Sequence, residues 1–350
     1  MTDRKKTKQI TVGGVAIGGG AAISVQSMCN TKTWDVEATV QQIRDLAAAG
    51  CDIVRLAIPD ERSALAIDKI KEQSPIPLVA DIHFDYRLAL LVAERGIDKI
   101  RINPGNIGAE ENVRAVAKAC KERNIPIRIG INAGSLERRL LEKYGHPCPQ
   151  ALVESAAGHV ALLRRFGFDD ICLSMKSSSV ALTIDSYRLA SEAVSYPLHL
   201  GVTETGTAWN GTIQSAVGIG TLLAEGIGDT IRVSLTADPV EEVKAGIAIL
   251  RALGLRRGGV RFISCPTCGR TEIDLIGLAT EVEQRLQNVH KDITVAVMGC
   301  VVNGPGEARE ADFGIAGGKG KGLLFKKGEV IGTYPYDRLC DALLEEIEKA

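Results

Sequence analysis

The sequence predicts an α/β fold, a (β/α)8 TIM barrel followed by a small α+β domain. Short β-branched runs alternate with longer amphipathic segments up to about residue 240, a pattern typical of parallel strands joined by helices. Eight such runs occur, the number that closes a barrel. Residues 250–261 then break the pattern with glycine and charge. We therefore expect a substrate-binding barrel over residues 1–255 and a second domain over residues 256–350.

The expected strands are short and rich in β-branched residues. They are 22–28, 52–58, 77–83, 99–105, 127–132, 171–176, 197–206 and 230–235. The main helices expected between them are 36–48, 86–95, 110–122, 150–165, 180–194 and 211–223. An open doubly wound sheet is the alternative fold. It is disfavoured because no glycine-rich dinucleotide fingerprint opens a helix after the first strand.

A charge-free run from Gln9 to Thr31 follows a basic start, as the apolar part of a signal peptide would. Glycines and polar residues interrupt this run, which makes it too polar for a signal peptide or a membrane span. Its first part, ITVGGVAIGG, predicts a glycine-turned hairpin instead. We expect no membrane segment.

The overall charge and the cysteine content argue against several further classes of protein. With 42 Lys and Arg against 43 Asp and Glu the chain is near neutral, which weighs against a nucleic-acid coat or a membrane-surface protein. Nine cysteines, an odd number, favour reduced thiols or metal ligands over disulfides. We therefore expect the protein to work in the cytoplasm.

The cysteines fall into two groups. Cys265 and Cys268 form a CxxC pair in CPTCGR, a spacing that lets two thiolates reach one metal or one cluster. Cys300 adds a third thiolate on a turn that follows an apolar strand. Most of the others are interpreted as buried small hydrophobes: Cys29, Cys51, Cys120, Cys148 and Cys172.

The fourth ligand decides the chemistry of this site, and the candidates are Glu307, Cys340 and His290. Cys340 would complete a closed four-thiolate zinc or iron site, which is structural. A carboxylate would leave one exchangeable position at which an iron can bind substrate. Glu307 follows Cys300 across a glycine and proline turn, whereas Cys340 lies in a helical tail. We favour Glu307.

Basic side chains occur at strand positions of the barrel. They are Arg55, Arg101, Arg128, Lys176 and Arg232. Buried charges need partners, and the nearest acids, Asp81 and Glu204, are too few to neutralise them all. The surplus predicts a phosphorylated ligand, and the planar fork of arginine favours a diphosphate. Solvated salt bridges at the rim are the alternative.

Polar groups that can orient hydroxyls accompany these cations. They are Asn103, Asn132, Thr203 and Ser234. Asp81 and His83 are two residues apart and therefore share one face of a strand, and a histidine can titrate near neutral pH. Glu204, at the end of the seventh strand, is a candidate proton donor or acceptor.

These residues lie in motifs through which the chain resembles the (E)-4-hydroxy-3-methylbut-2-enyl diphosphate synthase family of the methylerythritol phosphate route to isoprenoids. The motifs run from end to end of the chain: VQSMCNT (25–31), VADIHFDYR (79–87), RINPGNIG (101–108), IRIGINAGSLE (127–137), EGIGDTIRVSL (225–235), CPTCGR (265–270) and GCVVNGPGEA (299–308). Ala22 and Cys29 depart from the expected pattern, and neither is a proposed ligand.

The resemblance implies a cofactor and a set of ligands. A [4Fe-4S] cluster would be held by Cys265, Cys268, Cys300 and Glu307. The substrate diphosphate would be bound by Arg55, Arg101, Arg128 and Lys176, in a pocket lined by His83, Asn103, Asn132, Arg232 and Ser234. It further implies a homodimer in which the cluster domain of one subunit closes over the barrel mouth of the other.

The implied reaction is the two-electron reductive ring opening of 2-C-methyl-D-erythritol 2,4-cyclodiphosphate, with loss of an oxygen as water. The cluster would deliver electrons one at a time from flavodoxin or ferredoxin, and its unique iron, once Glu307 yields, would act as a Lewis acid on the departing oxygen. We expect Glu204 to deliver the proton.

Two other functions fit parts of the sequence. A phosphate-binding barrel lyase or aldolase could carry a structural zinc in the small domain, with Lys176 as its Schiff-base lysine. A zinc ribbon at CPTCGR could dock nucleic acid, but Lys and Arg do not outnumber Asp and Glu from Gly259 onward, which argues against a phosphate-backbone partner.

Overall fold

The structure is a computed structural model that describes residues 2–103, 105–287, 289, 291–300 and 309–350. The chain divides into two compact units between Arg256 and Arg257. Each unit has its own hydrophobic core. None of the described helices is both long enough and apolar enough to cross a membrane.

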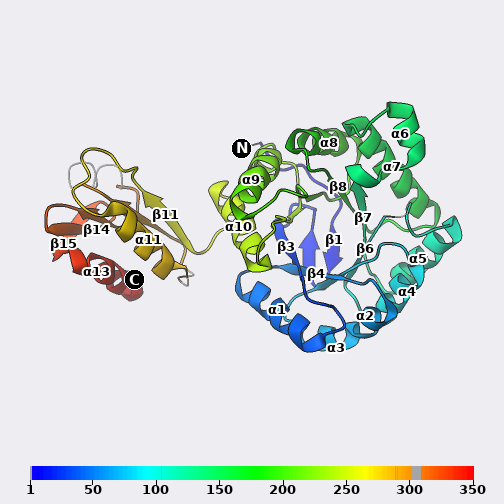
Figure 1. Ribbon diagram of the computed structural model, residues 1–350, viewed down its shortest axis with the longest axis horizontal. Helices are drawn as coiled ribbons and strands as arrows, with labels where there is room; N and C mark the ends of the chain where they lie inside the picture. Colours follow the sequence, from blue (N-terminus) through cyan, green and yellow to red (C-terminus); the bar gives the residue numbers. More distant parts are fainter. Residues whose placement is uncertain (1, 104, 288, 290, 301–308) are drawn as a thin grey trace. The chain divides into compact units, whose positions relative to one another are not determined.

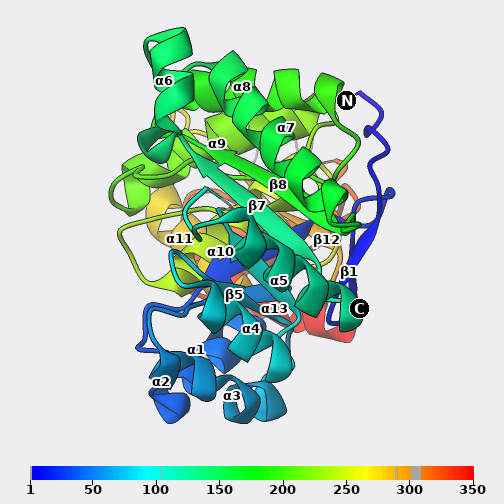
Figure 2. The same ribbon diagram turned by 90° about the vertical axis from the view of Figure 1, so that its right-hand side faces the viewer.

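The larger unit contains a sheet of eight parallel strands in the order β8-β7-β6-β5-β4-β3-β10-β9. The strands are β3 (Ser24–Met28), β4 (Ile53–Ala57), β5 (Leu78–Asp81), β6 (Lys99–Ile102), β7 (Ile127–Asn132), β8 (Ile171–Lys176), β9 (His199–Leu200) and β10 (Thr230–Ile231). A parallel bridge between Leu173 and Leu198 joins β8 to β9, so the sheet closes on itself. The predicted barrel is confirmed (Figure 1). Figure 2 shows the long strands β7 and β8 side by side.

Helices surround the barrel (Figure 1). They are α1 (Val36–Ala48), α2 (Glu61–Leu65), α3 (Ile67–Gln73), α4 (Tyr86–Glu94), α5 (Glu110–Glu122), α6 (Arg138–Tyr144), α7 (Pro149–Arg165), α8 (Val180–Ala193), α9 (Ala208–Ala224) and α10 (Pro239–Ala252). Several begin at a residue whose side chain accepts a first-turn N–H, such as Asp35, Ser179 and Asp238. The bounds of α1 and α5 agree with the prediction, and α9 begins three residues before the predicted Gly211.

The last two barrel strands are much shorter than the predicted 197–206 and 230–235. The chain leaves the extended conformation after β9, because Glu204 and Gly206 have φ angles of 58° and 88°. Such left-handed residues cannot continue a strand. The residues predicted as the second half of the seventh strand therefore form a loop at the barrel mouth.

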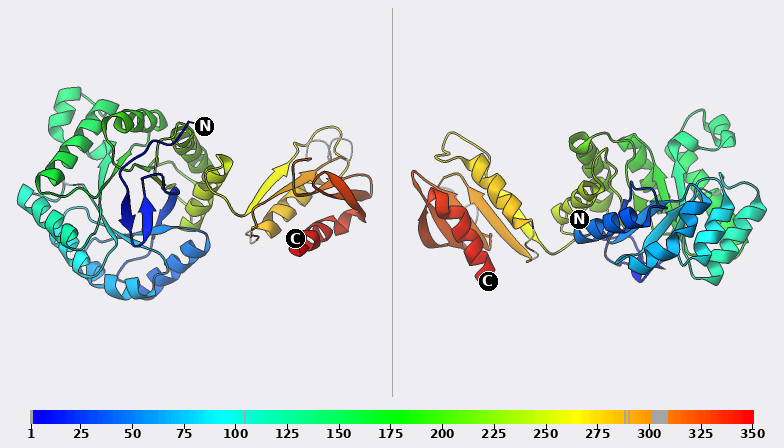
Figure 3. Two further views of the ribbon diagram at one scale, coloured as in Figure 1. Left: turned by 180° about the vertical axis from the view of Figure 1, so that it is seen from behind. Right: turned by 60° about the horizontal axis from the view of Figure 1, so that its bottom comes forward.

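A hairpin packs against the opposite end of the barrel. Its strands β1 (Ile10–Val12) and β2 (Val15–Ile17) pair antiparallel, as predicted for ITVGGVAIGG. Its apolar side chains pack against Ile53, Val79 and Cys172, near the starts of three barrel strands. The hairpin appears in dark blue in the left view of Figure 3. Ligands therefore approach from the other end, where the strands finish.

The smaller unit is an α+β domain, as predicted. Its sheet has the order β11-β12-β13-β14-β15, and its elements are β11 (Val260–Ser264), α11 (Leu275–Leu286), β12 (Ile293–Met298), β13 (Phe313–Gly317), β14 (Lys321–Lys326), β15 (Glu329–Pro335) and α13 (Leu339–Lys349). Apolar residues of α11 and α13 form one core with β12 and β13. Helix α11 begins at Leu275 because Asp274 caps it, its side chain accepting from the N–H of Gly277.

Candidate functional site

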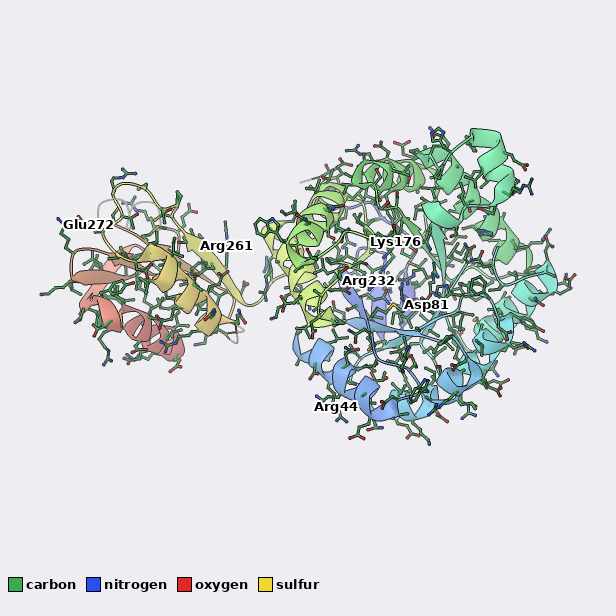
Figure 4. All side chains as sticks on the ribbon, viewed as in Figure 1. Arg44, Asp81, Lys176, Arg232, Arg261 and Glu272 are labelled. Atoms are coloured by element: carbon green, nitrogen blue, oxygen red, sulfur yellow. The ribbon has the colours of Figure 1, made fainter. Side chains whose placement is uncertain are left out.

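Polar residues predicted to bind a ligand gather at the mouth of the barrel. Asp81, Asn132 and Lys176 are the last residues of β5, β7 and β8. Figure 4 shows Asp81, Lys176 and Arg232 within the ring of barrel helices. Because the strands are parallel, their carboxyl ends share one end of the barrel, which is where catalytic groups lie in this fold.

Asp81 is the centre of a buried ionic group. Its side chain is 2% exposed and its carboxylate lies 3.2 Å from Arg101 Nη1, 3.3 Å from His83 Nε2 and 3.7 Å from Arg55 Nε. Burial alone would raise the pKa of Asp81, but Arg55, His83 and Arg101 together hold it well below its usual value. Asp81 therefore stays anionic and orients the groups around it.

Arg128 lies deeper in the barrel. It is 1% exposed, and its Nη1 donates to Gln26 Oε1 at 2.7 Å across the interior. Burial, reinforced by Arg55, lowers its pKa to about 9. Its Nε has no partner among the described residues. Gln26 was not among the predicted site residues, although it lies in the motif VQSMCNT and is two positions from Met28 on the inner face of β3.

Arg232 pairs with an acid that was not among the two expected near the barrel cations, Asp81 and Glu204. Arg232 Nη2 lies 3.3 Å from the carboxylate of Glu242, a buried residue of α10. Among the ion pairs of the described residues none involves Glu204, which is exposed to solvent. The expectation that Glu204 neutralises a barrel cation is therefore wrong. A strand pattern could not reveal Glu242, because it belongs to a helix outside the sheet.

Three further buried groups enlarge the basic interior. Lys176 is 8% exposed. Burial, and to a lesser extent the positive charge of Arg232, hold its pKa well below the usual value. Lys99, which was not predicted, is fully buried, and burial lowers its pKa to about 7. His199 of β9 is also fully buried and receives a 3.3 Å contact from Thr230. Strand alternation could have identified Lys99, because it lies two residues before Arg101.

The charges of this interior do not balance within the described residues. Four arginines line it, Arg55, Arg101, Arg128 and Arg232, together with Lys99 and Lys176, whose pKa values burial lowers. The carboxylates that pair with them in this part of the structure are Asp81 and Glu242. Buried unpaired cations are costly, so the arrangement suits an anionic ligand with several negative charges.

Neutral polar groups border the cations. Asn103 is 7% exposed, and its Oδ1 accepts from the N–H of Gly105 at 3.1 Å. Asn132, Thr203 and Ser234 are half-buried. The side chain of His83 is 53% exposed, so its free ring face is open to solvent at the mouth.

Glu204 occupies an unusual backbone conformation at this mouth. Its φ of 58° lies in the left-handed region, which glycine favours and other residues rarely adopt. The conformation costs about 1 to 3 kcal/mol in a residue with a side chain, and such residues cluster at functional sites. The carboxyl group is exposed and is available to a ligand in the barrel mouth.

In the smaller unit two of the predicted cluster ligands, Cys265 and Cys300, follow neighbouring parallel strands and lie at one edge of the sheet. β11 and β12 are parallel neighbours, with Ser264 in register with Val297. Cys265 directly follows β11 and Cys300 follows β12 by two residues. The N–H of Gly299 donates to Cys265 Sγ at 3.2 Å. Thiolates accept such bonds from backbone N–H groups, so this edge fits a metal-bound sulfur.

The other predicted ligands of this unit have different settings. Cys268 is exposed, and the backbone N–H and side chain of Arg270 lower its pKa. Among the described residues no group of three or more His, Cys, Asp or Glu side chains is arranged to hold a metal ion. Glu307 and His290 lie outside the described residues.

Cys340, another candidate for the fourth ligand, is buried in the core of the smaller unit. It is 4% exposed, and its Sγ accepts from Arg285 Nη1 at 3.4 Å. Arg285 is in the last turn of α11, the end farther along the chain from the CxxC segment. Burial raises the pKa of the Cys340 thiol to about 11. These contacts are those of a core cysteine between α11 and α13.

Comparisons with known proteins cover almost the whole chain. A family described as the GcpE TIM-barrel domain matches residues 7–247, and one described as the GcpE protein C-terminal domain matches residues 261–349. A 4-hydroxy-3-methylbut-2-en-1-yl diphosphate synthase (flavodoxin) of Clostridium perfringens is 63% identical over 346 residues, 99% of each chain. One of Geobacter sulfurreducens is 60% identical, over 99% of this chain and 98% of the relative.

Comparison with solved structures shows a similarity of fold only. Dihydropteroate synthase from Stenotrophomonas maltophilia superposes with a TM-score of 0.53 at 13% identity, covering 71% of this chain and 97% of that one. At such identity the likeness shows a shared barrel and no shared function. The family assignment follows from the sequence relatives: the chain belongs to the GcpE family, that of the 4-hydroxy-3-methylbut-2-en-1-yl diphosphate synthases (flavodoxin).

Proposed function

We propose that the protein is an oxidoreductase of isoprenoid biosynthesis that converts 2-C-methyl-D-erythritol 2,4-cyclodiphosphate into (E)-4-hydroxy-3-methylbut-2-enyl diphosphate. The product is the compound in the relatives' names. The observation that carries the proposal is the surplus of buried cations at the barrel mouth, which matches a substrate that holds two phosphates in one ring.

The cations would bind and orient the diphosphate. Arg55 and Arg101 already share Asp81, so their guanidinium groups are held in place before substrate arrives. Arg128 and Lys176 approach from β7 and β8. A pocket preorganised in this way lowers the barrier by fixing the reacting carbon in position. Asn103, Asn132, Thr203 and Ser234 would receive the hydroxyl groups, with His83 beside Asp81.

Proton delivery would fall to Glu204. The reaction releases an oxygen as water, which requires a proton at the departing oxygen. Glu204 lies in the loop after β9, exposed at the same end of the barrel as the proposed diphosphate ligands. His83, in contact with the carboxylate of Asp81, is the second titratable group of the site.

The reducing equivalents would come through a [4Fe-4S] cluster held by Cys265, Cys268, Cys300 and Glu307. Such a cluster, when bound, supplies electrons one at a time and offers an iron that can polarise an oxygen. The N–H of Gly299 on Cys265 Sγ and the lowered pKa of Cys268 fit thiolate ligands. The proposed substrate and cluster residues belong to different units, so turnover requires the two to meet.

We further propose flavodoxin as the electron donor, because the relatives' names include it, and a homodimer working in the cytoplasm. The 17-residue helix α9 carries no charged residue, and its Trp209, Ile213 and Val217 are 77%, 46% and 51% exposed at a spacing of four. Such an apolar stripe on a surface helix is typical of an interface, which supports self-association.

Anaerobic purification tests the proposal. We expect iron and sulfide in the protein, visible absorption that changes on addition of the cyclic diphosphate, and conversion of that compound when a reductant is supplied, followed by phosphorus NMR. Zinc in a colourless protein that does not convert the cyclic diphosphate would support the barrel lyase instead.

A further inference from the structure

The backbone at Glu204 needs an external constraint. Three non-glycine residues among the described ones have positive φ, and Glu204 is the one at the barrel mouth. An exposed residue relaxes from this conformation unless its neighbours hold it. The residues around Glu204 therefore determine where its carboxyl group points.

Thr205, the next residue along the chain, is held in place by a short hydrogen bond. It is 3% exposed, and its Oγ1 donates to the backbone oxygen of Ser234 at 2.5 Å. A side chain larger than hydrogen at Gly211 would place its Cβ 2.8 Å from this hydroxyl, so α9 packs directly against it. The backbone oxygen of Thr205 accepts from Gln214 Nε2 at 3.3 Å.

A second connection reinforces the first. The N–H of Thr236 donates to the backbone oxygen of Gly206 at 2.9 Å, and Thr207 forms a parallel bridge with Thr236. The loop after β9 is thus tied to the loop after β10 both through the Thr205 hydroxyl and through the residues that follow it, Gly206 and Thr207. The second loop also carries Ser234, a proposed substrate residue.

We propose that Thr205 is a positioning residue for proton transfer by Glu204. Its buried hydroxyl ties the backbone next to Glu204 to the backbone of Ser234, so the proton donor and a substrate contact keep a fixed separation. This inference rests on the proposed role of Glu204. Small displacements of a catalytic group reduce turnover far more than they reduce binding.

The experiment compares Thr205→Val, which keeps the shape and removes the hydroxyl, with Thr205→Ser, which keeps the hydroxyl. Cluster-loaded full-length protein is assayed with the cyclic diphosphate across pH. We expect Thr205→Val to lower kcat by about 10- to 100-fold with KM little changed and the pH profile of kcat displaced. Thr205→Ser should recover most of the activity.

Thr207→Val is the matched control, because Thr207 is exposed and its side chain makes no capping bond. It should behave as the wild type. Should Thr205→Val fail to fold, Gln214→Met removes the other side-chain bond of the loop from a half-buried position and is expected to lower kcat in the same sense.

Two outcomes separate this inference from the proposed function. If Glu204→Gln abolishes turnover while folded Thr205→Val has wild-type kcat and pH profile, Glu204 keeps its role and the positioning inference is wrong. If Glu204→Gln turns over normally, the role of Glu204 itself is wrong, and the inference falls with it. The inference would also be overturned if Thr205→Val raised KM by as large a factor as it lowered kcat and if Thr205→Ser did not restore the activity.

Discussion

The guanidinium of Arg232 lies 3.3 Å from both carboxylate oxygens of Glu242, which joins the end of the barrel sheet to helix α10. Glu242 also accepts from Ser27 Oγ and from the N–H of Leu235, each at 3.0 Å. One buried carboxylate thus connects β3, the loop after β10 and α10. Arg232 is thereby held at the mouth before any ligand binds.

Replacing Glu242 should therefore destabilise the larger unit. Glu242→Ala leaves Arg232 buried without its partner, and breaking such a pair costs about 3 to 5 kcal/mol in free energy of unfolding. Urea unfolding checks this value. Both tryptophans of the chain, Trp34 and Trp209, lie in the larger unit, so their fluorescence reports its unfolding.

Glu241→Ala is the control for this prediction. Glu241 is the preceding residue of α10, and its side chain is 50% exposed in a surface pair with Lys244. Such pairs contribute about 0 to 1 kcal/mol. Equal losses for the two variants would mean that the buried pair contributes no more than a surface one.

The sequence predicted the strands better than it predicted the partners of their charges. Alternation of apolar runs identified all eight strands, because the barrel interior requires buried residues at every second position. Glu242 and Gln26 were missed because contacts across a barrel or from a helix depend on closure, which no local pattern encodes. Glu204 was placed in a strand because a left-handed glutamate has no sequence signature.

The candidate ligands of the smaller unit show the same contrast between what local sequence patterns reveal and what depends on packing. The CxxC spacing and the apolar strand before Cys300 were sufficient to place Cys265 and Cys300 at one sheet edge, because parallel neighbouring strands end together. The burial of Cys340 against Arg285 depends on how α13 packs, so the sequence alone left it as a ligand candidate.

We predict that position 130 must be glycine to leave room for the side chain of Arg101. A Cβ at this position of β7 would lie 2.3 Å from Arg101 Nε, a distance that forces the guanidinium to move. Arg101 would then lose its contact with Asp81. We expect Gly130→Ala to reduce kcat/KM by about 10- to 100-fold, or about 1.4 to 2.7 kcal/mol of transition-state binding.

Gly134→Ala is the matched variant for this test. Gly134 lies just beyond the same strand, and a Cβ there meets nothing within 4 Å. Its activity should stay at the wild-type level. If Gly130→Ala is equally active, the position of Arg101 is not limiting for the reaction.

Lys99 should make the stability of the larger unit depend on pH. Its pKa is 10.5 in the unfolded chain and about 7 in the folded protein, because burial disfavours the charged form. Between these values the unfolded chain binds more protons, so the free energy of unfolding rises with pH from about 7 towards 10.5 through this group. Below this window the cost of burying the charge is fully present.

The measurement compares wild type with Lys99→Met at several pH values. The variant should be the more stable protein at neutral pH, and its advantage should shrink as the pH rises through the window. Lys118→Met on α5, where the side chain is 76% exposed, is the control and should show a constant difference. A Lys99→Met difference that does not change with pH would mean that Lys99 stays charged when buried.

The cysteines of the smaller unit should differ in their effect on iron binding. Cys300 lies at the same sheet edge as Cys265, whereas Cys340 packs between α11 and α13. We therefore expect Cys300→Ser to purify without iron and without activity. Cys340→Ser should retain its iron and most of its activity, and lose about 1 kcal/mol of stability at most from the changed core contact.

Iron and sulfide analysis of anaerobically purified protein checks both variants, and tryptophan fluorescence shows that the larger unit stays folded. Cys148→Ser, a half-buried thiol of the larger unit, controls for the loss of any cysteine. Loss of iron from Cys340→Ser as well as from Cys300→Ser would assign the fourth position to the Cys340 thiol. The coordination would then be closed by four sulfurs, no exchangeable position would remain for substrate, and Glu307 would lose its proposed role.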